Sequence, residues 1–366
     1  MKVCLIGNNL TSLILAYILS QKNFSVTIYY SKSIKSNFET RSLGIADHNL
    51  KYLESYFKNI SEITNNINEI KVLIKNKNKN ENKEIIFNKK NTTLFNMVNY
   101  NQILTYVKSK IRMKKNVSQK CLNRKIDLNF FNKTKFNLII NCERTNNLTN
   151  KYLKNGLTKN YNNKAFTTFI RHEKIKNNRA TQIFTDNGPI AYLPLSEKIT
   201  SVVFSYDMNK NKSVSEKEIQ KKIEQNNPCY KILSSKKIQN FNLNLKLPRK
   251  YYFKNILFFG DSIHSIHPLA GQGFNMTLRD IARLDKLIDN RISLGLPIDK
   301  NIYKEFENKT KSYNLTFSLG VDLIYEFFKI DRKLIPNLIS KKIFNFINKS
   351  QKIKDLGINF ANQGRL

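Results

Sequence analysis

The sequence lacks features that mark several common classes of protein. Its 366 residues include no tryptophan, four cysteines, four histidines and 11 glycines. The cysteines form no CxxC pair, which argues against a disulfide framework or a zinc site and favours a reducing compartment. No HExxH motif occurs, so we expect no metal centre. No apolar run reaches the ~20 residues that are needed to span a bilayer.

Acidic residues are also scarce. The chain has 27 Asp and Glu residues against 63 Lys and Arg residues, a formal net charge of +36. Such a charge raises the hypothesis of a nucleic-acid partner. The lysines, however, are spread along the chain among many asparagines, without a basic stripe or a binding motif, which favours a general compositional bias. We therefore expect no nucleic acid as a partner, and an anionic membrane surface is the better candidate.

What is present suits a large folded protein that begins with a βαβ unit. Hydrophobic residues make up 40% of the chain, enough for a sizeable core. A strand, a buried helix and a second strand are expected over residues 3–6, 10–21 and 24–30. The turn after the first strand reads GNNLTS, where the dinucleotide fingerprint is GxGxxG. Only Gly7 matches; Asn9, which tolerates positive φ, and Ser12 replace the other two glycines.

The rest of the chain divides into helical and strand-like regions. Helices are expected over residues 48–70, 100–111, 216–226 and 229–239, and nearly throughout 275–366. Buried strands are expected over residues 136–141 and 255–259, and the polar run 75–84 predicts a hairpin tip or exposed loop. The runs AFTTFIRHE, ATQIFT, IAYLPLS and ITSVVFSY, all after residue 160, predict an antiparallel sheet and therefore a second lobe.

The segment Gly260–Asp280, GDSIHSIHPLAGQGFNMTLRD, carries the strongest functional signal. It follows a strand and opens a helix, and three of the chain's few glycines lie in it. Glycine lets backbone N–H groups approach a ligand, and a helix N-terminus favours negative charge. Asp261, at the end of the strand, can accept hydrogen bonds from ligand hydroxyls. An ordinary strand–loop–helix connection would not require these residues at these spacings.

This segment resembles the second FAD signature of the aromatic-ring hydroxylase superfamily of flavoproteins. It is most similar to the ubiquinone-biosynthesis hydroxylases of the octaprenyl-phenol hydroxylase type. Ala180–Phe184 and Gly188–Ser196 follow the strand pattern of that family, and the pair His172–Glu173 precedes it. The end of the chain, from LIYEFFKIDRKLIPNLI to KIKDLGINFANQG, has the family's tail pattern. The resemblance therefore spans essentially the whole chain.

The resemblance implies FAD as the cofactor and NAD(P)H as the reductant. Asp261 would contact the flavin ribityl chain, Arg41 would lie near the flavin, and Gln102 would face the cofactor. For Arg41 the alternative is a solvated surface arginine. The residues around the isoalloxazine ring would be Pro268, Gly271, Gln272, Gly273 and Asn275, and those at the dinucleotide end would be Gly7, Asn9 and Ser12. No catalytic side chain is assigned, because the cofactor performs the chemistry. His264 and His267 are expected to shape the loop.

The adenosine end departs from the family pattern at two further places. The acidic residue expected after the second strand is absent from Tyr29–Ser31. The family's DG motif is replaced by CERT, Cys142–Thr145, in which Glu143 stands for the aspartate and Arg144 for the glycine. The sequence thus predicts a retained flavin end and a degraded adenosine end.

The implied fold class is α/β (α+β), a Rossmann-like FAD-binding lobe with an inserted antiparallel-sheet substrate lobe and a helical C-terminal region. We expect the FAD-binding lobe over residues 1–160 and 250–300, with strands near 70–100 lent to the substrate lobe. The substrate lobe itself is expected over residues 161–249, and the C-terminal helical region over 301–366.

The implied function is hydroxylation of the aromatic ring of a polyprenylated phenol in ubiquinone biosynthesis, by O2 and reduced flavin through a C4a-hydroperoxide. One alternative is a flavin-fold protein without turnover that assembles with other quinone-biosynthesis proteins. A hydroxylase of a soluble aromatic compound is disfavoured by the tail. Basic and apolar residues interleave over Lys329–Asp355, which suits an interfacial helix on anionic lipid as well as a helix packed on the core. We expect a cytoplasmic protein, peripheral on the inner membrane face.

Overall fold

The structure is a computed structural model that describes most of the chain. The described residues are 1–31, 39–74, 83–89, 92–123, 126–132, 135–209, 213–267, 271–331 and 345–363. Pro268, most of the polar run 75–84 and four basic residues of the tail (Arg332, Lys333, Lys341 and Lys342) therefore lie outside the described residues. Among the described residues, no helix is both long and apolar enough to cross a bilayer.

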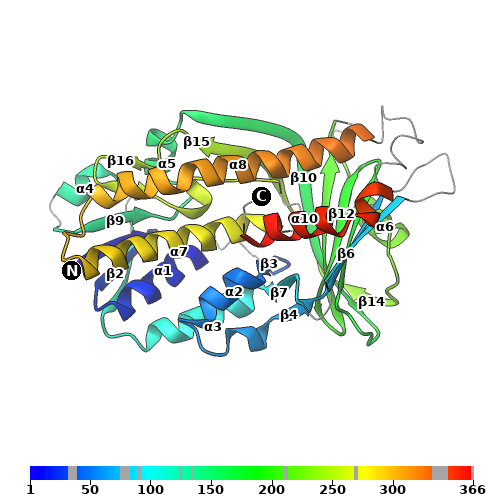
Figure 1. Ribbon diagram of the computed structural model, residues 1–366, viewed down its shortest axis with the longest axis horizontal. Helices are drawn as coiled ribbons and strands as arrows, with labels where there is room; N and C mark the ends of the chain where they lie inside the picture. Colours follow the sequence, from blue (N-terminus) through cyan, green and yellow to red (C-terminus); the bar gives the residue numbers. More distant parts are fainter. Residues whose placement is uncertain are drawn as a thin grey trace.

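A mostly parallel sheet forms one end of the molecule (Figure 1). Its strand order is β16–β17–β9–β1–β2–β8, and only β16 runs antiparallel to its neighbour. The strands are β1 (Lys2–Ile6), β2 (Ser25–Ser31), β8 (Val117–Leu122), β9 (Leu138–Asn141), β16 (Tyr252–Phe253) and β17 (Ile256–Phe258). Helix α1 (Leu10–Gln21) connects β1 to β2, and ten of its 12 residues are buried. The predicted βαβ unit is confirmed.

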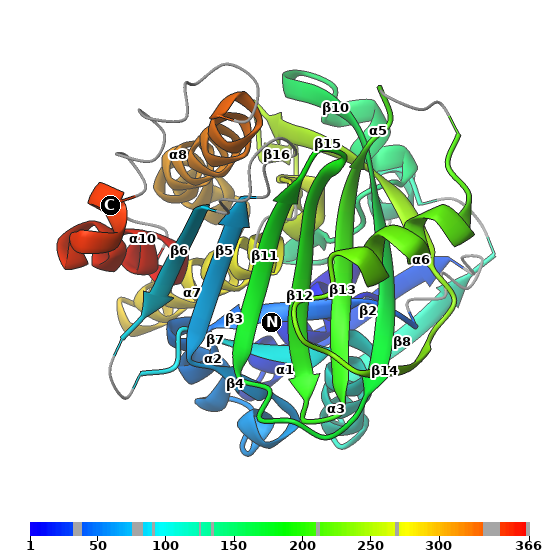
Figure 2. The same ribbon diagram turned by 90° about the vertical axis from the view of Figure 1, so that its right-hand side faces the viewer.

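A larger, mostly antiparallel sheet forms the other end (Figure 2). Its strand order is β14–β10–β13–β12–β11–β5–β6, and β15 also pairs with β10. These strands are β5 (Glu69–Ile74), β6 (Lys83–Asn88), β10 (Gly156–His172), β11 (Arg179–Thr185), β12 (Gly188–Ser196), β13 (Ile199–Asp207), β14 (Ile232–Ser235) and β15 (Gln239–Pro248). The four predicted strand runs are β10 to β13, and β11 also pairs in parallel with β5. The α/β fold class is confirmed, whereas the lobe boundaries stay a prediction.

A small antiparallel sheet and several helices connect these two ends. The sheet has the order β3–β7–β4, with β3 (Ser42–Ala46), β4 (Asn65–Ile67) and β7 (Phe95–Asn99). The shorter helices are α2 (Asp47–Glu54), α3 (Tyr100–Arg112), α4 (Leu128–Asn132), α5 (Asn147–Tyr152) and α6 (Glu216–Gln225). The long helices are α7 (Gln272–Ser293) and α8 (Asn301–Asp331), and α10 (Gln351–Gln363) follows them in the chain. Helices α7 and α8 lie side by side along the molecule (Figure 1).

Two helix predictions were wrong. Residues 48–70 hold only α2 and a 3-10 turn, Ile60–Ile63, before β4 and β5 begin. Residues 229–239 hold strand β14 instead of a helix. In both segments the mispredicted residues join a sheet, β4 with β7 and β14 with β10, and local sequence does not reveal such pairing because the partner strands lie far away in the chain.

Candidate functional site

Helix α7 begins at the glycine-rich turn, and its first turn carries no side-chain cap. Gly271 precedes the helix in the left-handed conformation, with φ of 66°. A Cβ at this position would lie 3.3 Å from the Gly44 nitrogen of β3, so glycine permits both the conformation and the close approach. Because the first N–H groups of a helix lack intrahelical partners, an uncapped end is suited to a negatively polarised ligand atom.

Asn275 holds this end of α7 against β3. Its side-chain Oδ1 accepts from the Ala46 N–H (2.8 Å) and from Asn49 Nδ2 (2.9 Å), and its Nδ2 donates to the Gly44 carbonyl (3.0 Å). The side chain is 1% exposed, so each contact is made away from water. The sequence placed Asn275 beside the ring through its backbone, whereas the structure shows its side chain joining two elements.

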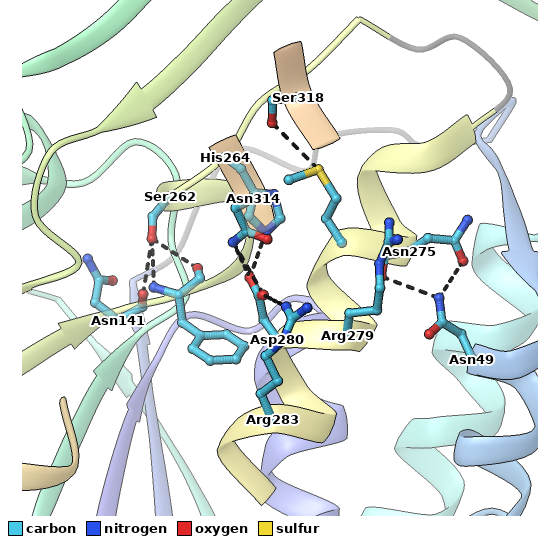
Figure 3. Close-up of polar contacts among 12 residues, drawn as sticks. Asn49, Asn141, Ser262, His264, Asn275, Arg279, Asp280, Arg283, Asn314 and Ser318 are labelled. Carbon is cyan, nitrogen blue, oxygen red and sulfur yellow. Dashed lines mark hydrogen bonds and ion pairs between the residues drawn. The ribbon is translucent and has the colours of Figure 1, made fainter. Parts of the chain in front are cut away.

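A second, fully buried contact joins the loop before α7 to the middle of the helix (Figure 3). His264 Nε2 lies 3.0 Å from Asp280 Oδ2, with side-chain exposures of 1% and 0%. Asp280 also accepts from Asn314 Nδ2 of α8 (3.0 Å) and from Arg283 (3.2 Å). A buried carboxylate needs such partners to offset its lost hydration. His264 thus shapes the loop, as the sequence suggested, by joining it to α7.

Asp261 and Arg41 both lie near Tyr100, at the N-terminal end of α1. The Arg41 guanidinium lies over the Tyr100 ring, 4.9 Å from its centroid. Burial raises the pKa of Tyr100; Asp261 raises it further, whereas Arg41 and a hydrogen bond from the Leu10 N–H lower it. These four groups therefore form one cluster. Asp261 is exposed there, so its carboxylate is open to a ligand.

The N-terminus of α1 is capped by the protein itself. Asn9 Oδ1 accepts from the Ser12 N–H (3.1 Å), and Ser12 Oγ accepts in turn from the Asn9 N–H (3.2 Å). Asn9 Nδ2 also donates to the Cys142 carbonyl (2.8 Å), which follows β9. The φ of Asn9 is −109°, so the tolerance of asparagine for positive φ is not used here. With the Leu10 N–H on Tyr100, the first turn has little donor capacity left.

Gly7 lies beneath the side chain of Glu143. Its φ is 111°, and a Cβ at this position would lie 2.6 Å from Glu143 Cγ. Burial raises the pKa of Glu143, while a hydrogen bond with Asn146 lowers it. Ser12 Oγ donates to the Gly7 carbonyl (2.6 Å), which closes the turn from the other side. Ser12, at the third glycine position of the fingerprint, thus uses its side chain to bond the turn.

The other site residues predicted from the sequence, Gln102, Gln272 and Gly273, make few contacts that bear on ligand binding. Gln102 is exposed on the first turn of α3, and among the described residues Ile266, 4.0 Å away, is the one near the Cβ position of Gly273. Gln272 is 8% exposed and lies within hydrogen-bond reach of Asn275.

Three residues that form contacts in the candidate site were not predicted from the sequence: Tyr100, Asn49 and Asp280. Only Asp280 carried a signal, since it ends the glycine-rich motif.

His267 and Arg279 are buried near α7 and carry side-chain nitrogens without a hydrogen-bond partner among the described residues, although Arg279 Nε donates to the Asn275 carbonyl (3.2 Å). Both ring nitrogens of His267 are unpaired, and its ring stacks on Tyr325 with 4.2 Å between centroids. Burial lowers the pKa of His267 to about 3, so the ring is neutral at pH 7. Arg279 lies over Phe317 with both Nη atoms unpaired, and burial lowers its pKa to about 10, so it stays charged. His267 directly precedes Pro268.

FAD fits this site unevenly. The open α7 terminus, the glycine cradle at Gly271 and the exposed Asp261 suit a flavin and its ribityl hydroxyls. Arg41 supplies positive charge beside α1. At the α1 turn, however, Asn9, Tyr100 and Glu143 occupy the donors and the space that a pyrophosphate would use.

Comparison with known proteins agrees with this reading. Residues 145–292 match a family described as FAD binding domain, a stretch that contains the α7 turn and leaves out GNNLTS. Over 253 residues the chain is 24% identical to the ubiquinone biosynthesis monooxygenase COQ6, mitochondrial, of Caenorhabditis elegans, covering 57% of this chain and 55% of that protein. Over 150 residues it is 29% identical to the 3-demethoxyubiquinol 3-hydroxylase of Escherichia coli strain K12, covering 39% and 38%.

These matches confirm the predicted resemblance to the ubiquinone-biosynthesis hydroxylases of the aromatic-ring hydroxylase superfamily. The fold alone is shared with p-nitrophenol 4-monooxygenase PnpA from Pseudomonas putida DLL-E4, with a TM-score of 0.74 at 13% identity, covering 100% of this chain and 98% of that one. The chain spans about half the length of the C. elegans relative, and less of the E. coli one.

Proposed function

We propose that the chain is an FAD-dependent monooxygenase that hydroxylates the aromatic ring of a polyprenylated phenol, with NAD(P)H as reductant and O2 as co-substrate. The observation that carries this proposal is the start of α7, a glycine-cradled and uncapped helix terminus held rigidly against β3. Similarity to ubiquinone-pathway hydroxylases supports the substrate class.

In this proposal the protein's own residues bind and orient. Asp261 would accept hydrogen bonds from the ribityl hydroxyls, and Arg41 would balance the phosphate charge. The first N–H groups of α7 would contact the flavin, because a helix N-terminus stabilises negative charge on a ligand. Bound FAD would supply the oxygen chemistry. The contacts of Asn275 and of the His264–Asp280 pair would fix the loop and helix that form this wall.

The proposal is tested on the purified protein. We expect flavin absorbance, either as purified or after incubation with FAD, and NAD(P)H oxidation that a short-chain prenylated phenol accelerates. Labelled oxygen from ¹⁸O2 should appear in the hydroxylated product. A colourless protein that takes up no added FAD contradicts the proposal.

One observation favours a second candidate, a flavin-fold protein without turnover that assembles with other quinone-biosynthesis proteins. The self-capped α1 terminus leaves few donors for the pyrophosphate. FAD uptake without NAD(P)H oxidation in the presence of any prenylated phenol would select this alternative. For the enzyme we also propose a peripheral position on the cytoplasmic membrane face, since a polyprenylated substrate resides in the lipid.

A further inference from the structure

Helix α8 changes character halfway along its exposed face. Its first half presents Asn301, Lys304, Asn308 and Ser312 to solvent, as a surface helix does. Its second half presents Leu315, Leu319 and Leu323, at spacings of four residues, with exposed fractions of 41%, 38% and 69%. We call these three leucines the α8 stripe. A row of large apolar side chains on one exposed face marks an interaction surface.

The inner face of the same helix is already occupied. Phe317, Val321 and Tyr325 are each at most 5% exposed and belong to the apolar cluster between α8 and the large sheet. The stripe is therefore additional to the residues that hold α8 in place. Folding alone gives no reason for leucine at these three positions.

Helix α10 extends the apolar surface. Phe360 stacks on Phe317 with 4.8 Å between centroids, and a Cβ at Gly320 of α8 would lie 2.7 Å from Phe360 Cζ, so α10 packs beside the stripe. Leu356, 50% exposed, and the exposed Lys352 precede Phe360 at spacings of four residues and so share its side of α10. Figure 2 shows α8 and α10 on the same side of the molecule.

The charges around the stripe are mostly positive. Lys304 and Lys311 lie eleven and four residues before Leu315, on the same helix face. The acidic residues of this part of α8, Asp322 and Glu326, are paired with Lys159 (2.8 and 2.9 Å). Lys304 and Lys311 form no ion pair with another described residue. An apolar row flanked by such lysines matches the interface of an anionic bilayer, where apolar side chains enter the acyl boundary and lysines meet the headgroups.

We propose that the α8 stripe, together with the adjoining row of α10, is the surface by which this protein docks on an anionic lipid bilayer. The choice of lipid over a protein partner rests on the proposed function, because a polyprenylated substrate resides in the bilayer. The α8 stripe differs from the interfacial tail expected over Lys329–Asp355, since it lies on a packed helix before that segment, whereas the row of α10 overlaps the expected tail at Lys352.

The test is co-sedimentation of the full chain with phosphatidylcholine vesicles, with and without phosphatidylglycerol. Wild-type protein binds the anionic vesicles at low salt. The double variant Leu319→Ser/Leu323→Ser loses about tenfold in partitioning, because two apolar anchors are removed. The matched control is Leu233→Ser on β14, a leucine with 63% exposure on another part of the surface, which binds as wild type does. Lys304→Glu/Lys311→Glu weakens binding to the anionic vesicles only.

Several outcomes overturn the proposal. These are absence of wild-type binding, an equal loss in Leu233→Ser, a melting temperature lowered by the double variant well beyond the control, and a wild-type dimer in sedimentation velocity that the double variant dissociates. The third would mean that another part of the chain covers the stripe, and the fourth that a second copy does. FAD uptake is measured in parallel, so vesicle binding without FAD retains the docking surface and rejects the proposed enzyme.

Discussion

The two helix N-termini of the candidate site, at α1 and α7, are built in opposite ways. At α1 the protein satisfies the first turn itself, through Asn9, Ser12 and the Tyr100 hydroxyl. At α7 the helix begins at a left-handed glycine without a side-chain cap. A capped terminus stabilises the fold without a ligand, whereas an open terminus keeps its donors for one. The difference agrees with the prediction of a retained flavin end and a degraded adenosine end, which the following variants test.

Closing the open terminus should have the largest effect. Gly271→Ala forces a Cβ into the left-handed region and towards the Gly44 nitrogen, 3.3 Å away. We expect a stability loss of about 1–2 kcal/mol and at least about a tenfold loss of FAD affinity. The control is Gly295→Ala, at φ of 64° with nothing within 4 Å of its Cβ position. Equal FAD affinity in the two variants, measured by flavin fluorescence titration, would show that α7 is not the flavin end.

Opening the capped terminus should act in the other direction. Asn9→Gly restores a fingerprint glycine and frees the Ser12 N–H for a phosphate oxygen. Since hydrogen bonds to charged groups contribute about 1.5–3 kcal/mol, FAD should bind about tenfold more tightly. The cap itself costs only a few tenths of a kcal/mol on replacement by glycine. The comparison variant is Asn9→Ala, which removes the capping side chain but does not introduce a glycine. Unchanged titration of Asn9→Gly would contradict competition between cap and cofactor.

Removing one hydroxyl should give a smaller gain. Tyr100→Phe releases the Leu10 N–H while the ring stays available to Arg41. We expect FAD affinity to rise by about fivefold and the melting temperature of the free protein to fall, since a hydrogen bond of about 1 kcal/mol is lost. Isothermal titration calorimetry with FAD measures the first effect. A fall in affinity would mean that the Tyr100 hydroxyl itself contacts the ligand.

The smallest effect should be a pH dependence from Glu143. Burial raises the pKa of this carboxyl above its usual range. The folded protein therefore binds this proton more tightly than the unfolded chain does. The contribution of the proton to the free energy of unfolding is present at low pH and is lost as the pH rises through the raised pKa. The same ionisation places a negative charge beside Gly7, so FAD affinity should fall over that range. In Glu143→Gln the FAD affinity should not change with pH over that range. At pH 8 it should be about threefold higher than the affinity of the wild-type protein. An identical slope in both proteins would assign the effect elsewhere.

The sequence alone determined the βαβ unit, the antiparallel strands β10 to β13, the start of α7 and the unequal quality of the two signatures. These follow from local patterns, namely apolar periodicity, glycine spacing and departures from a short motif. It could not place β4 and β14, which were mistaken for helix, because their pairing partners are distant in the chain.

Only the tertiary structure shows which contacts the residues of the two signatures make. The loss of glycine at position 9 is visible in the sequence, but the bond from Asn9 to the Cys142 carbonyl is not. The Tyr100 hydroxyl at α1, the Asn275 contacts with β3 and the His264–Asp280 pair all join residues that folding brings together. The exposed leucines of α8 needed the structure for the same reason. A sequence shows which side chains a helix has, whereas packing decides which of them remain without a neighbour.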